Sequence, residues 1–181
     1  MNAVRTKIPD VLLLTPKVFG DDRGFFYESF NARVFAKEVG REVKFVLDNH
    51  SKSARNVLRG LHYQVKNVQG KLVRVTAGEV YDVVVDLRRS SPTFGKWVSA
   101  TLSATNRQML WVPEGFAHGF VVTSESAEFL YKTTDYYAPE HERSLLWNDP
   151  DLGIPWPLEG APLLKPNDER GTPLKQAETF A

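Results

Sequence analysis

The sequence predicts a mainly β protein whose strands form an antiparallel sandwich or barrel. Short apolar segments follow one another along most of the chain, with glycine, asparagine, proline or serine between them. Only one segment combines helical spacing with capping residues. Aromatic residues make up 12% of the 181 residues, which suits a barrel whose interior holds a ligand.

The strands can be placed from their apolar and aromatic residues. Before the helix, strands are expected at residues 11–14 and 23–30, with a turn at residues 20–22. Later strands are expected at residues 45–50, 57–64, 72–77, 79–87, 97–102, 109–112, 120–123 and 128–134. From residue 138 prolines become frequent, so residues 138–181 are expected to pack on the barrel as an irregular tail within one domain of residues 1–181.

The one helix is expected directly after residue 30. Asn31 is a good N-cap, because its side chain can accept hydrogen bonds from the first free N–H groups. Phe35 and Val39 are one turn apart and would lie on the same face. Gly40 can adopt the left-handed conformation that ends many helices.

The segment 79–87 has two different faces. One face is apolar throughout, whereas the other places Asp82 and Asp86 among valines. A half-polar interior around a ligand would explain this second face, and an exposed edge strand would explain it equally well.

Composition excludes several classes of function. The chain has 23 Lys and Arg against 22 Asp and Glu, a net charge of +1, so there is no general field for nucleic acid or an anionic membrane. The absence of cysteine excludes disulfides, thiolate nucleophiles and zinc–thiolate sites, and it fits a cytoplasmic protein. No apolar run approaches the ~20 residues of a membrane span, and residues 11–14 are too few for a signal-peptide core.

The motif Arg59-Gly60-Leu61-His62-Tyr63-Gln64 is the candidate reactive centre. Strand alternation places Arg59 and His62 on opposite faces, so both can reach one ligand only if the strand is offset between them. Gly60 would tolerate such a bulge. The alternative is an ordinary strand with a hydrogen-bonded core histidine and a solvated arginine.

The residue types favour acid–base chemistry. Metal-binding cupin barrels usually carry a His-x-His pair, but Gln64 stands two residues after His62, so no metal is expected. A Gly-x-Ser-x-Gly elbow and a phosphate-binding loop are also absent. Proton transfer beside a carbonyl could use His62 as base, Lys71 as oxyanion partner and Tyr131 as acid. Alternatively, Lys71 is a surface charge and Tyr131 a packing residue.

Several motifs in order resemble the dTDP-4-dehydrorhamnose 3,5-epimerase family. The resemblance runs from about Arg23 to Asp168, and the motifs together are highly specific. They are Arg23-Gly24-Phe25-Phe26-Tyr27-Glu28, Asp48-Asn49-His50-Ser51, Arg59-Gly60-Leu61-His62-Tyr63-Gln64, Gln69-Gly70-Lys71-Leu72-Val73-Arg74, Pro113-Glu114-Gly115-Phe116-Ala117-His118-Gly119-Phe120 and Tyr131-Lys132-Thr133-Thr134-Asp135-Tyr136-Tyr137.

The resemblance implies a fold and a reaction. The fold would be a cupin-type jelly-roll antiparallel barrel with a few short helices and no metal or other cofactor. The reaction would invert C3 and C5 of dTDP-4-dehydro-6-deoxy-D-glucose to give dTDP-4-dehydro-L-rhamnose. His62 would be the base, Asp168 its carboxylate partner, Lys71 the holder of the enolate oxygen and Tyr131 the acid. Lys71 would also lower the pKa of the tyrosine.

The resemblance also implies binding residues and a homodimer. Tyr137 would stack on thymine, and N-terminal strands would reach into the neighbouring subunit, where Arg23 and Glu28 would complete its site. The expected substrate-binding residues are Arg23, Glu28, Leu47, Asp48, Asn49, Arg59, His118, Tyr137 and Glu142. Leu47 stands where the family usually has glutamine, and Pro166-Asn167 stand where Glu-Lys is common.

Three other functions remain open at this point. A single-site epimerase, acting at C3 or C5 in an antibiotic-sugar pathway, would share the barrel and the histidine. A non-catalytic barrel that binds nucleotide sugars would need only the binding residues. A metal-dependent cupin oxygenase or isomerase would need ligands in addition to His62.

Overall fold

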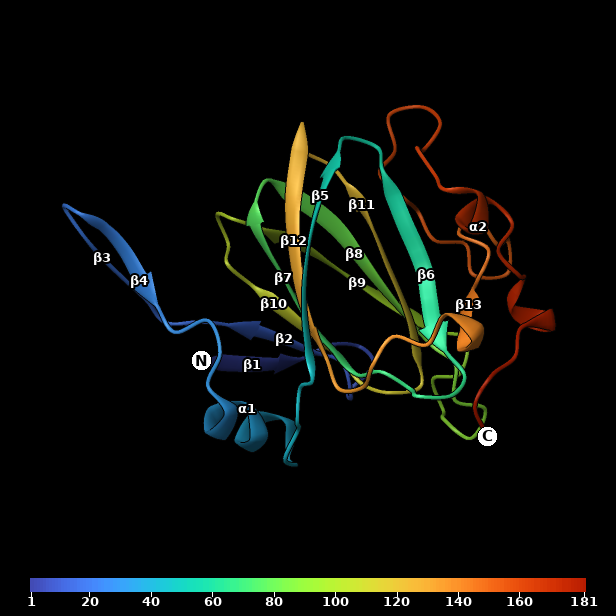
Figure 1. Cartoon of the computed structure of the whole chain (residues 1–181), viewed down its shortest axis with the longest axis horizontal. Helices are drawn as coiled ribbons and strands as arrows, with labels where there is room; N and C mark the ends of the chain where they lie inside the picture. The colour runs from blue at the N-terminus through green and yellow to red at the C-terminus, as the bar shows by residue number, and fades with distance from the viewer.

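Two antiparallel β-sheets face each other in the structure, a computed structural model that describes residues 1–181 (Figure 1). The six-stranded sheet has the order β1 (Asn2–Arg5), β2 (Leu12–Thr15), β10 (Met109–Val112), β7 (Lys71–Ala77), β12 (Ser126–Thr133) and β5 (Leu47–Ala54). The five-stranded sheet has the order β13 (Glu142–Ser144), β6 (Leu58–Gln64), β11 (Phe116–Val122), β8 (Glu79–Asp86) and β9 (Trp97–Ser103). The prediction of a mainly β, antiparallel fold is confirmed.

The core lies between the inner faces of the two sheets. Its fully buried residues include Val73 of the first sheet and Val80 and Val84 of the second. Phe120 and Phe129 stack across the two sheets with ring centroids 4.1 Å apart. Burying these side chains supplies the main driving force for closing one sheet on the other.

Helix α1 (Ala32–Val39) covers part of the outer face of the six-stranded sheet. The Asn31 side chain accepts hydrogen bonds from the first turn, and Gly40 ends the helix with φ of +82°. Phe35 is fully buried and meets the Trp111 ring edge-on at 5.2 Å. The expected helix is therefore confirmed, with both of its caps.

The strand predictions are right for most segments and differ from the structure in several places. Strand β11 begins at Phe116, not at residue 120, because the chain pairs with β6 and β8 directly after the turn at 113–115. Residues 23–30 form only the second strand of a hairpin, β3 (Val18–Asp21) and β4 (Gly24–Tyr27). Strands β1, β3 and β13 were not expected, since each has only three or four residues.

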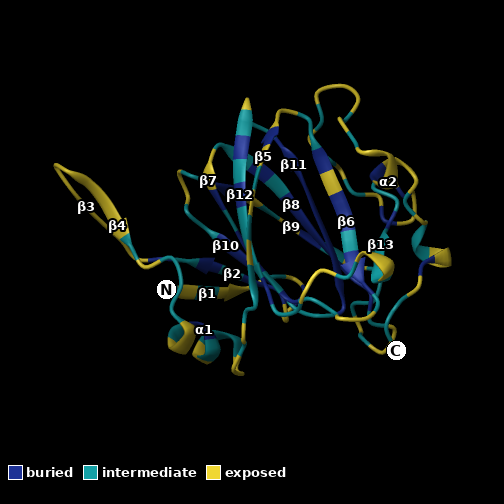
Figure 2. Cartoon of the chain, viewed as in Figure 1, coloured by how far each residue is buried: buried dark blue, intermediate teal, exposed yellow.

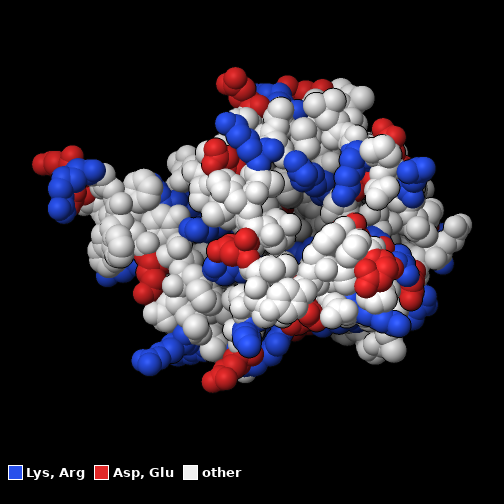
Figure 3. Space-filling view, viewed as in Figure 1, with Lys and Arg blue, Asp and Glu red and all other residues white.

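The β3–β4 hairpin projects away from both sheets (Figures 1 and 2). Its aromatic side chains are largely in solvent: Phe19 is 54%, Phe25 62% and Phe26 70% exposed. In Figure 3 the hairpin presents uncharged atoms between its charged tip and the body of the molecule. Exposed aromatic surface on an extended arm is typical of a segment that docks on another molecule.

The tail 138–181 covers the outer face of the five-stranded sheet. Leu145, Leu152 and Ala177 of the tail form one buried cluster with Val83 and Val85 of β8. The tail contains three short helical turns, η1 (Pro139–His141), α2 (Pro166–Glu169) and η2 (Leu174–Gln176), connected by irregular backbone. None of the helices is long and apolar enough to cross a membrane.

The two faces of β8 are now explained. The strand lies between β11 and β9, so the alternative of an exposed edge strand is wrong. The tail covers its apolar face, and both carboxylates on the other face, Asp82 and Asp86, are fully buried. Only Asp82 approaches the ligand-sized cavity described below, because its partner His118 lines that cavity.

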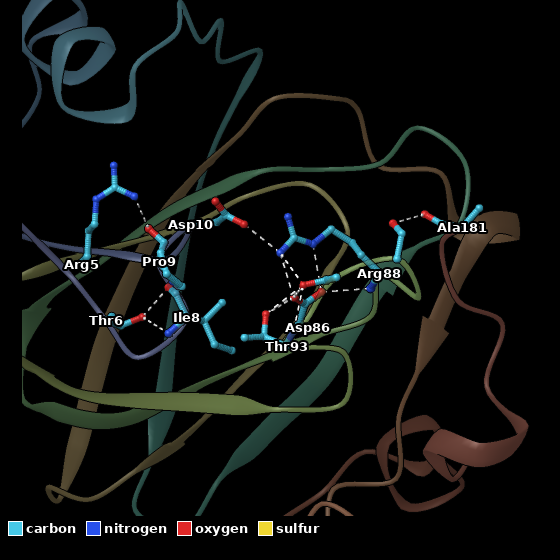
Figure 4. Close-up of polar contacts among 11 residues, drawn as sticks. Arg5, Thr6, Ile8, Pro9, Asp10, Asp86, Arg88, Thr93 and Ala181 are labelled. Carbon is cyan, nitrogen blue, oxygen red and sulfur yellow. Dashed lines mark hydrogen bonds and ion pairs between the residues drawn. The ribbon is translucent and has the colours of Figure 1, made fainter.

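Asp86 belongs to a structural network at the end of β8 (Figure 4). Its carboxylate accepts hydrogen bonds from Arg88 Nε at 2.9 Å, and from the hydroxyls of Ser91 and Thr93 at 2.7 Å each. Arg88 also forms an ion pair with Asp10 at 2.8 Å. Burial alone would raise the pKa of Asp86, but these hydrogen bonds lower it to about 2.

We expect this network to make stability depend on pH in acid. The pKa of Asp86 is about 2 in the folded protein and 3.8 in the unfolded chain, so the ionised form stabilises the fold by about 2 kcal/mol. This contribution is complete above pH ~4 and is lost as the pH falls towards ~2. Urea unfolding of wild type and Asp86→Asn should therefore differ most above pH ~4. A constant difference from pH ~5 to ~2 would contradict the assignment.

Candidate active site

A cavity of about 360 Å³ opens between the two sheets. Side chains from the inner faces of both sheets and from the tail line it. The lining residues are Leu47, Asn49, Ser51, Arg59, His62, Tyr63, Gln64, Gln69, Lys71, His118, Phe120, Phe129, Tyr131, Thr133, Tyr137, Glu142 and Lys165. Most of the residues expected from the sequence thus come together around one space.

Strand β6 is offset by one residue between Arg59 and His62, as expected. Against β11, His62 pairs with His118 but Arg59 pairs with Phe120, so two residues of β6 oppose Gly119 alone. Gly60 has φ of +121°, and a Cβ there would come within 2.6 Å of Gly119 Cα. The bulge brings both Arg59 and His62 to the cavity, which regular alternation would not do.

Two histidine–carboxylate pairs lie side by side. His62 Nε2 is 2.5 Å from Asp168 Oδ1, and Asp168, carried by α2, is only 1% exposed. On the neighbouring strand, His118 Nε2 lies 2.9 Å and 3.0 Å from the two carboxylate oxygens of Asp82. Burial raises the pKa of Asp82, against the opposing charges of His118 and Lys71. A carboxylate on one ring nitrogen fixes the imidazole and favours a base at the other.

Lys71 and Tyr131 lie on neighbouring strands, β7 and β12, of the sheet opposite His62. Burial lowers the pKa of Lys71 to about 8, although Glu142 and Asp82 act in the other direction. Burial raises the pKa of Tyr131, and the charge that opposes this rise is that of Arg59, not of Lys71. The expectation that Lys71 lowers the pKa of this tyrosine is therefore wrong, because the cost of burying a phenolate is the larger effect.

Strand alternation divides the expected residues of β5. Leu47 and Asn49 point inward and line the cavity. Asp48 lies on the outer face, where its carboxylate accepts a hydrogen bond from Lys132 at 2.7 Å. Within one chain, Asp48 therefore does not line the cavity.

Tyr137 and Glu142 lie at the rim. The Tyr137 ring is 58% exposed, and its hydroxyl donates to Glu142 Oε2 at 3.2 Å. Partial burial and the negative charge of Glu142 raise the pKa of Tyr137. An exposed aromatic face beside a polar cavity can stack on a flat ligand group.

Arg23 and Glu28 do not reach the cavity of their own chain. Arg23 lies at the tip of the β3–β4 hairpin, where its side chain is 89% exposed and forms an ion pair with Asp21. Glu28 follows β4 and is exposed. Arg23 lies in the turn of the β3–β4 hairpin and Glu28 directly follows its second strand, and this hairpin projects away from the two sheets (Figure 1).

Lys165 is a lining residue that the sequence did not single out, although it stands three residues before Asp168. With Arg59 and Lys71 it makes three cations in the lining, against one carboxylate, Glu142. None of the three cations forms an ion pair within the chain. Cations held without carboxylate partners favour an anionic ligand such as a diphosphate.

No group of three or more histidine, aspartate or glutamate side chains is arranged to hold a metal ion. The chemistry that the lining residues themselves can perform is proton transfer, by His62 with its buried carboxylate and by Tyr131. Lys71 can stabilise a developing oxyanion. Fold and site together define an antiparallel β-sheet enzyme that moves protons on an anionic substrate.

The chain belongs to the dTDP-4-dehydrorhamnose 3,5-epimerase family, whose sequence model matches residues 5–176. It is 63% identical over 180 residues to a dTDP-4-dehydrorhamnose 3,5-epimerase of Pseudomonas aeruginosa, covering 99% of both chains. It is 60% identical over 178 residues to the enzyme of that name from Salmonella typhimurium, covering 98% of this chain and 97% of that protein.

A solved structure is similar over nearly the whole chain. It is the dTDP-6-deoxy-D-glucose-3,5-epimerase of Legionella pneumophila in complex with dTDP-4-keto-L-rhamnose. The TM-score is 0.95 at 50% sequence identity, with 98% of this chain and 94% of that chain covered. The chain is therefore an isomerase with the fold of this epimerase family, as its motifs indicated.

Proposed function

We propose that the cavity inverts C3 and C5 of dTDP-4-dehydro-6-deoxy-D-glucose and so forms dTDP-4-dehydro-L-rhamnose, a step of dTDP-L-rhamnose biosynthesis. The observation that carries the proposal is the His62–Asp168 pair, facing Lys71 and Tyr131 across one cavity. The names of the relatives, and the product bound in the Legionella structure, support the same substrate class.

Each inversion has two proton transfers. His62 takes the proton from the carbon beside the C4 ketone, and the electron pair of that C–H bond moves to the ketone oxygen to form an enolate. The Lys71 ammonium stabilises this oxygen. Tyr131 gives its phenolic proton to the opposite face of the carbon, and solvent then removes a proton from His62 and restores one to Tyr131. The raised pKa of Tyr131 keeps its proton available until that step.

The remaining lining residues would hold the nucleotide. Arg59 and Lys165 supply charge for the diphosphate, while Tyr137 offers its exposed ring to thymine. We assign Leu47, Asn49, His118 and Glu142 to the sugar and nucleoside, since all four line the same cavity. Asp168 comes from the tail, so we propose that residues 1–181 work as one unit. We also propose that the enzyme is cytoplasmic, which the absence of cysteine fits.

Proton exchange tests this function directly. We expect incubation of the dTDP-4-ketosugar with the enzyme in deuterated water, with chelator present, to place deuterium at both C3 and C5. Mass spectrometry and NMR would locate the label, and a coupled rhamnose-forming reductase would report the product. Label at one carbon alone would identify a single-site epimerase instead, and dTDP binding without any label would identify a binding protein.

We further propose that the enzyme is a homodimer in which the β3–β4 hairpin docks on the neighbouring subunit. The exposed Phe19, Phe25 and Phe26 support this, as does the position of Arg23 and Glu28 outside their own cavity. Burial of these rings against a second copy would remove apolar surface from water, and Arg23 and Glu28 would then complete the neighbour's site.

Mixed dimers give a sharp test of this exchange. Arg23→Ala and His62→Asn should each yield weakly active homodimers. Mixing and refolding the two variants should restore activity, because one site of each heterodimer then has both its own His62 and an intact Arg23 from the neighbour. Steady-state rates across mixing ratios measure the effect, with light scattering to count subunits. No recovery in confirmed heterodimers would show that Arg23 acts within its own chain or not at all.

A further inference from the structure

Gln64 is a buried amide two residues after His62 on strand β6, and it is only 4% exposed. Its Nε2 donates to the carbonyl oxygens of Asn67 at 2.7 Å and Tyr136 at 3.1 Å. Its Oε1 accepts a hydrogen bond from the backbone N–H of Ala138 at 2.8 Å. One side chain therefore ties the loop after β12 to the strand that carries the histidine.

These bonds leave Gln64 no free donor for a ligand. A primary amide has two N–H groups, and both are given to backbone carbonyls. Its orientation is also fixed, because carbonyl oxygens can only accept and the Ala138 N–H can only donate. Although Gln64 borders the cavity, its polar atoms serve the protein backbone and its effect on a ligand must pass through other residues.

The two loop residues that it holds are the neighbours of Tyr137 on either side. The Tyr136 carbonyl belongs to the peptide group before Tyr137, and the Ala138 N–H belongs to the peptide group after it. Gln64 therefore holds both peptide groups that adjoin Tyr137. The Tyr137 ring itself has little support, since it is 58% exposed and bonds only to Glu142 at its hydroxyl. Glu142 in turn pairs with Gln64 in the β13–β6 ladder.

We propose that Gln64 is a positioning residue that sets the Tyr137 ring over the nucleobase of the substrate. It ties the loop that carries the base-stacking ring to the strand that carries the catalytic histidine, so that the nucleoside and the reacting sugar are positioned relative to the same strand. This proposal rests on the proposed role of Tyr137 as the residue that stacks on the base. A ring already fixed before binding loses less conformational freedom when the ligand arrives.

Two substitutions separate the hydrogen bonds from the shape of the side chain. Gln64→Met keeps the approximate volume and removes all three bonds, whereas Gln64→Glu keeps the acceptor for Ala138 and loses both donors. We expect each to weaken dTDP binding, measured by calorimetry, by about fivefold or more, because a stacked base contributes that much or more to binding. KM for the dTDP-ketosugar should rise in parallel, with kcat within about twofold of wild type.

Gln108→Glu is the matched control. It makes the same chemical change at an amide that donates to the Thr15 hydroxyl; neither residue lines the cavity, so the Kd for dTDP should be unchanged. Thermal unfolding of every variant checks the fold. If Gln64→Glu does not fold, Gln64→Met alone decides, since it introduces no charge. A kcat loss with unchanged KM and Kd in a folded Gln64 variant would overturn the proposal.

A double-mutant cycle with Tyr137→Ala tests whether Gln64 acts through the ring. If it does, the Gln64 substitution should weaken dTDP binding in the wild-type background but have little further effect in the Tyr137→Ala background. Fully additive effects would overturn the positioning role. If Tyr137→Ala alone leaves dTDP affinity unchanged, the proposed stacking role of Tyr137 fails instead, and the two failures are thus distinguished.

Discussion

His62→Asn is expected to lower kcat by between about 10² and 10⁴-fold while leaving the Kd for dTDP within a few-fold of wild type. The substitution removes the base but keeps a side chain of similar size that can bond to Asp168. The cations and the exposed ring proposed to hold the nucleotide are unchanged. Single-turnover kinetics and calorimetry with dTDP measure the two effects separately.

His50→Asn is a suitable control, because His50 lies on β5 and pairs with Glu128 outside the cavity lining. It should have wild-type kinetics. Turnover retained by His62→Asn would refute the assignment of the base. Equal losses of kcat and dTDP affinity would mean that the imidazole supports the nucleotide site and not a proton transfer alone.

Lys71→Met is expected to lower kcat/KM by about 10² to 10³-fold, the cost of removing one oxyanion-stabilising group. The wild-type enzyme should also lose activity as the pH rises through about 8, because the pKa of Lys71 in the free enzyme is about 8 and only the ammonium form stabilises an enolate. The profile of kcat/KM against pH measures this. In Lys71→Met the residual activity should no longer fall near that pH.

The fall of kcat/KM above pH ~8, the alkaline limb of the pH profile, distinguishes Lys71 from Tyr131. Burial raises the pKa of Tyr131 above its usual 10, so its ionisation cannot produce a fall near pH 8. Tyr131→Phe should therefore keep the limb while losing net inversion. If the limb disappears in Tyr131→Phe and persists in Lys71→Met, the assignment of the two groups is wrong.

Residue type alone proposed His62, Lys71 and Tyr131, whereas Asp168 and the binding residues came from the family resemblance. The offset at Gly60, needed for Arg59 and His62 to face one ligand, followed from strand alternation alone, and the ladder against β11 confirms it. On β5 the resemblance proposed Leu47, Asp48 and Asn49 together, but only Leu47 and Asn49 line the cavity. Asp48 was expected to bind the substrate because it lies within the motif, but a run of adjacent polar residues does not reveal which side chains point inward.

Other features depend on burial and on distant contacts, which a local pattern does not encode. The pKa of Tyr131 moved opposite to expectation because burial outweighs neighbouring charge there. The partner of His62 was reached only through family resemblance, since Asp168 lies on the short helix α2 of the tail, 106 positions along the chain from His62. Lys165 was missed because its position at the rim follows from how the tail folds back on the sheet.

The distance along the chain between His62 and Asp168 has a consequence for biosynthesis. The two residues are 106 positions apart, so a ribosome releases the strand with the imidazole long before the carboxylate that orients it. A nascent chain can therefore close much of its core while its catalytic pair is still incomplete. The catalytic pair is completed late, when the last quarter of the polypeptide packs on the outer face of the five-stranded sheet and supplies Asp168.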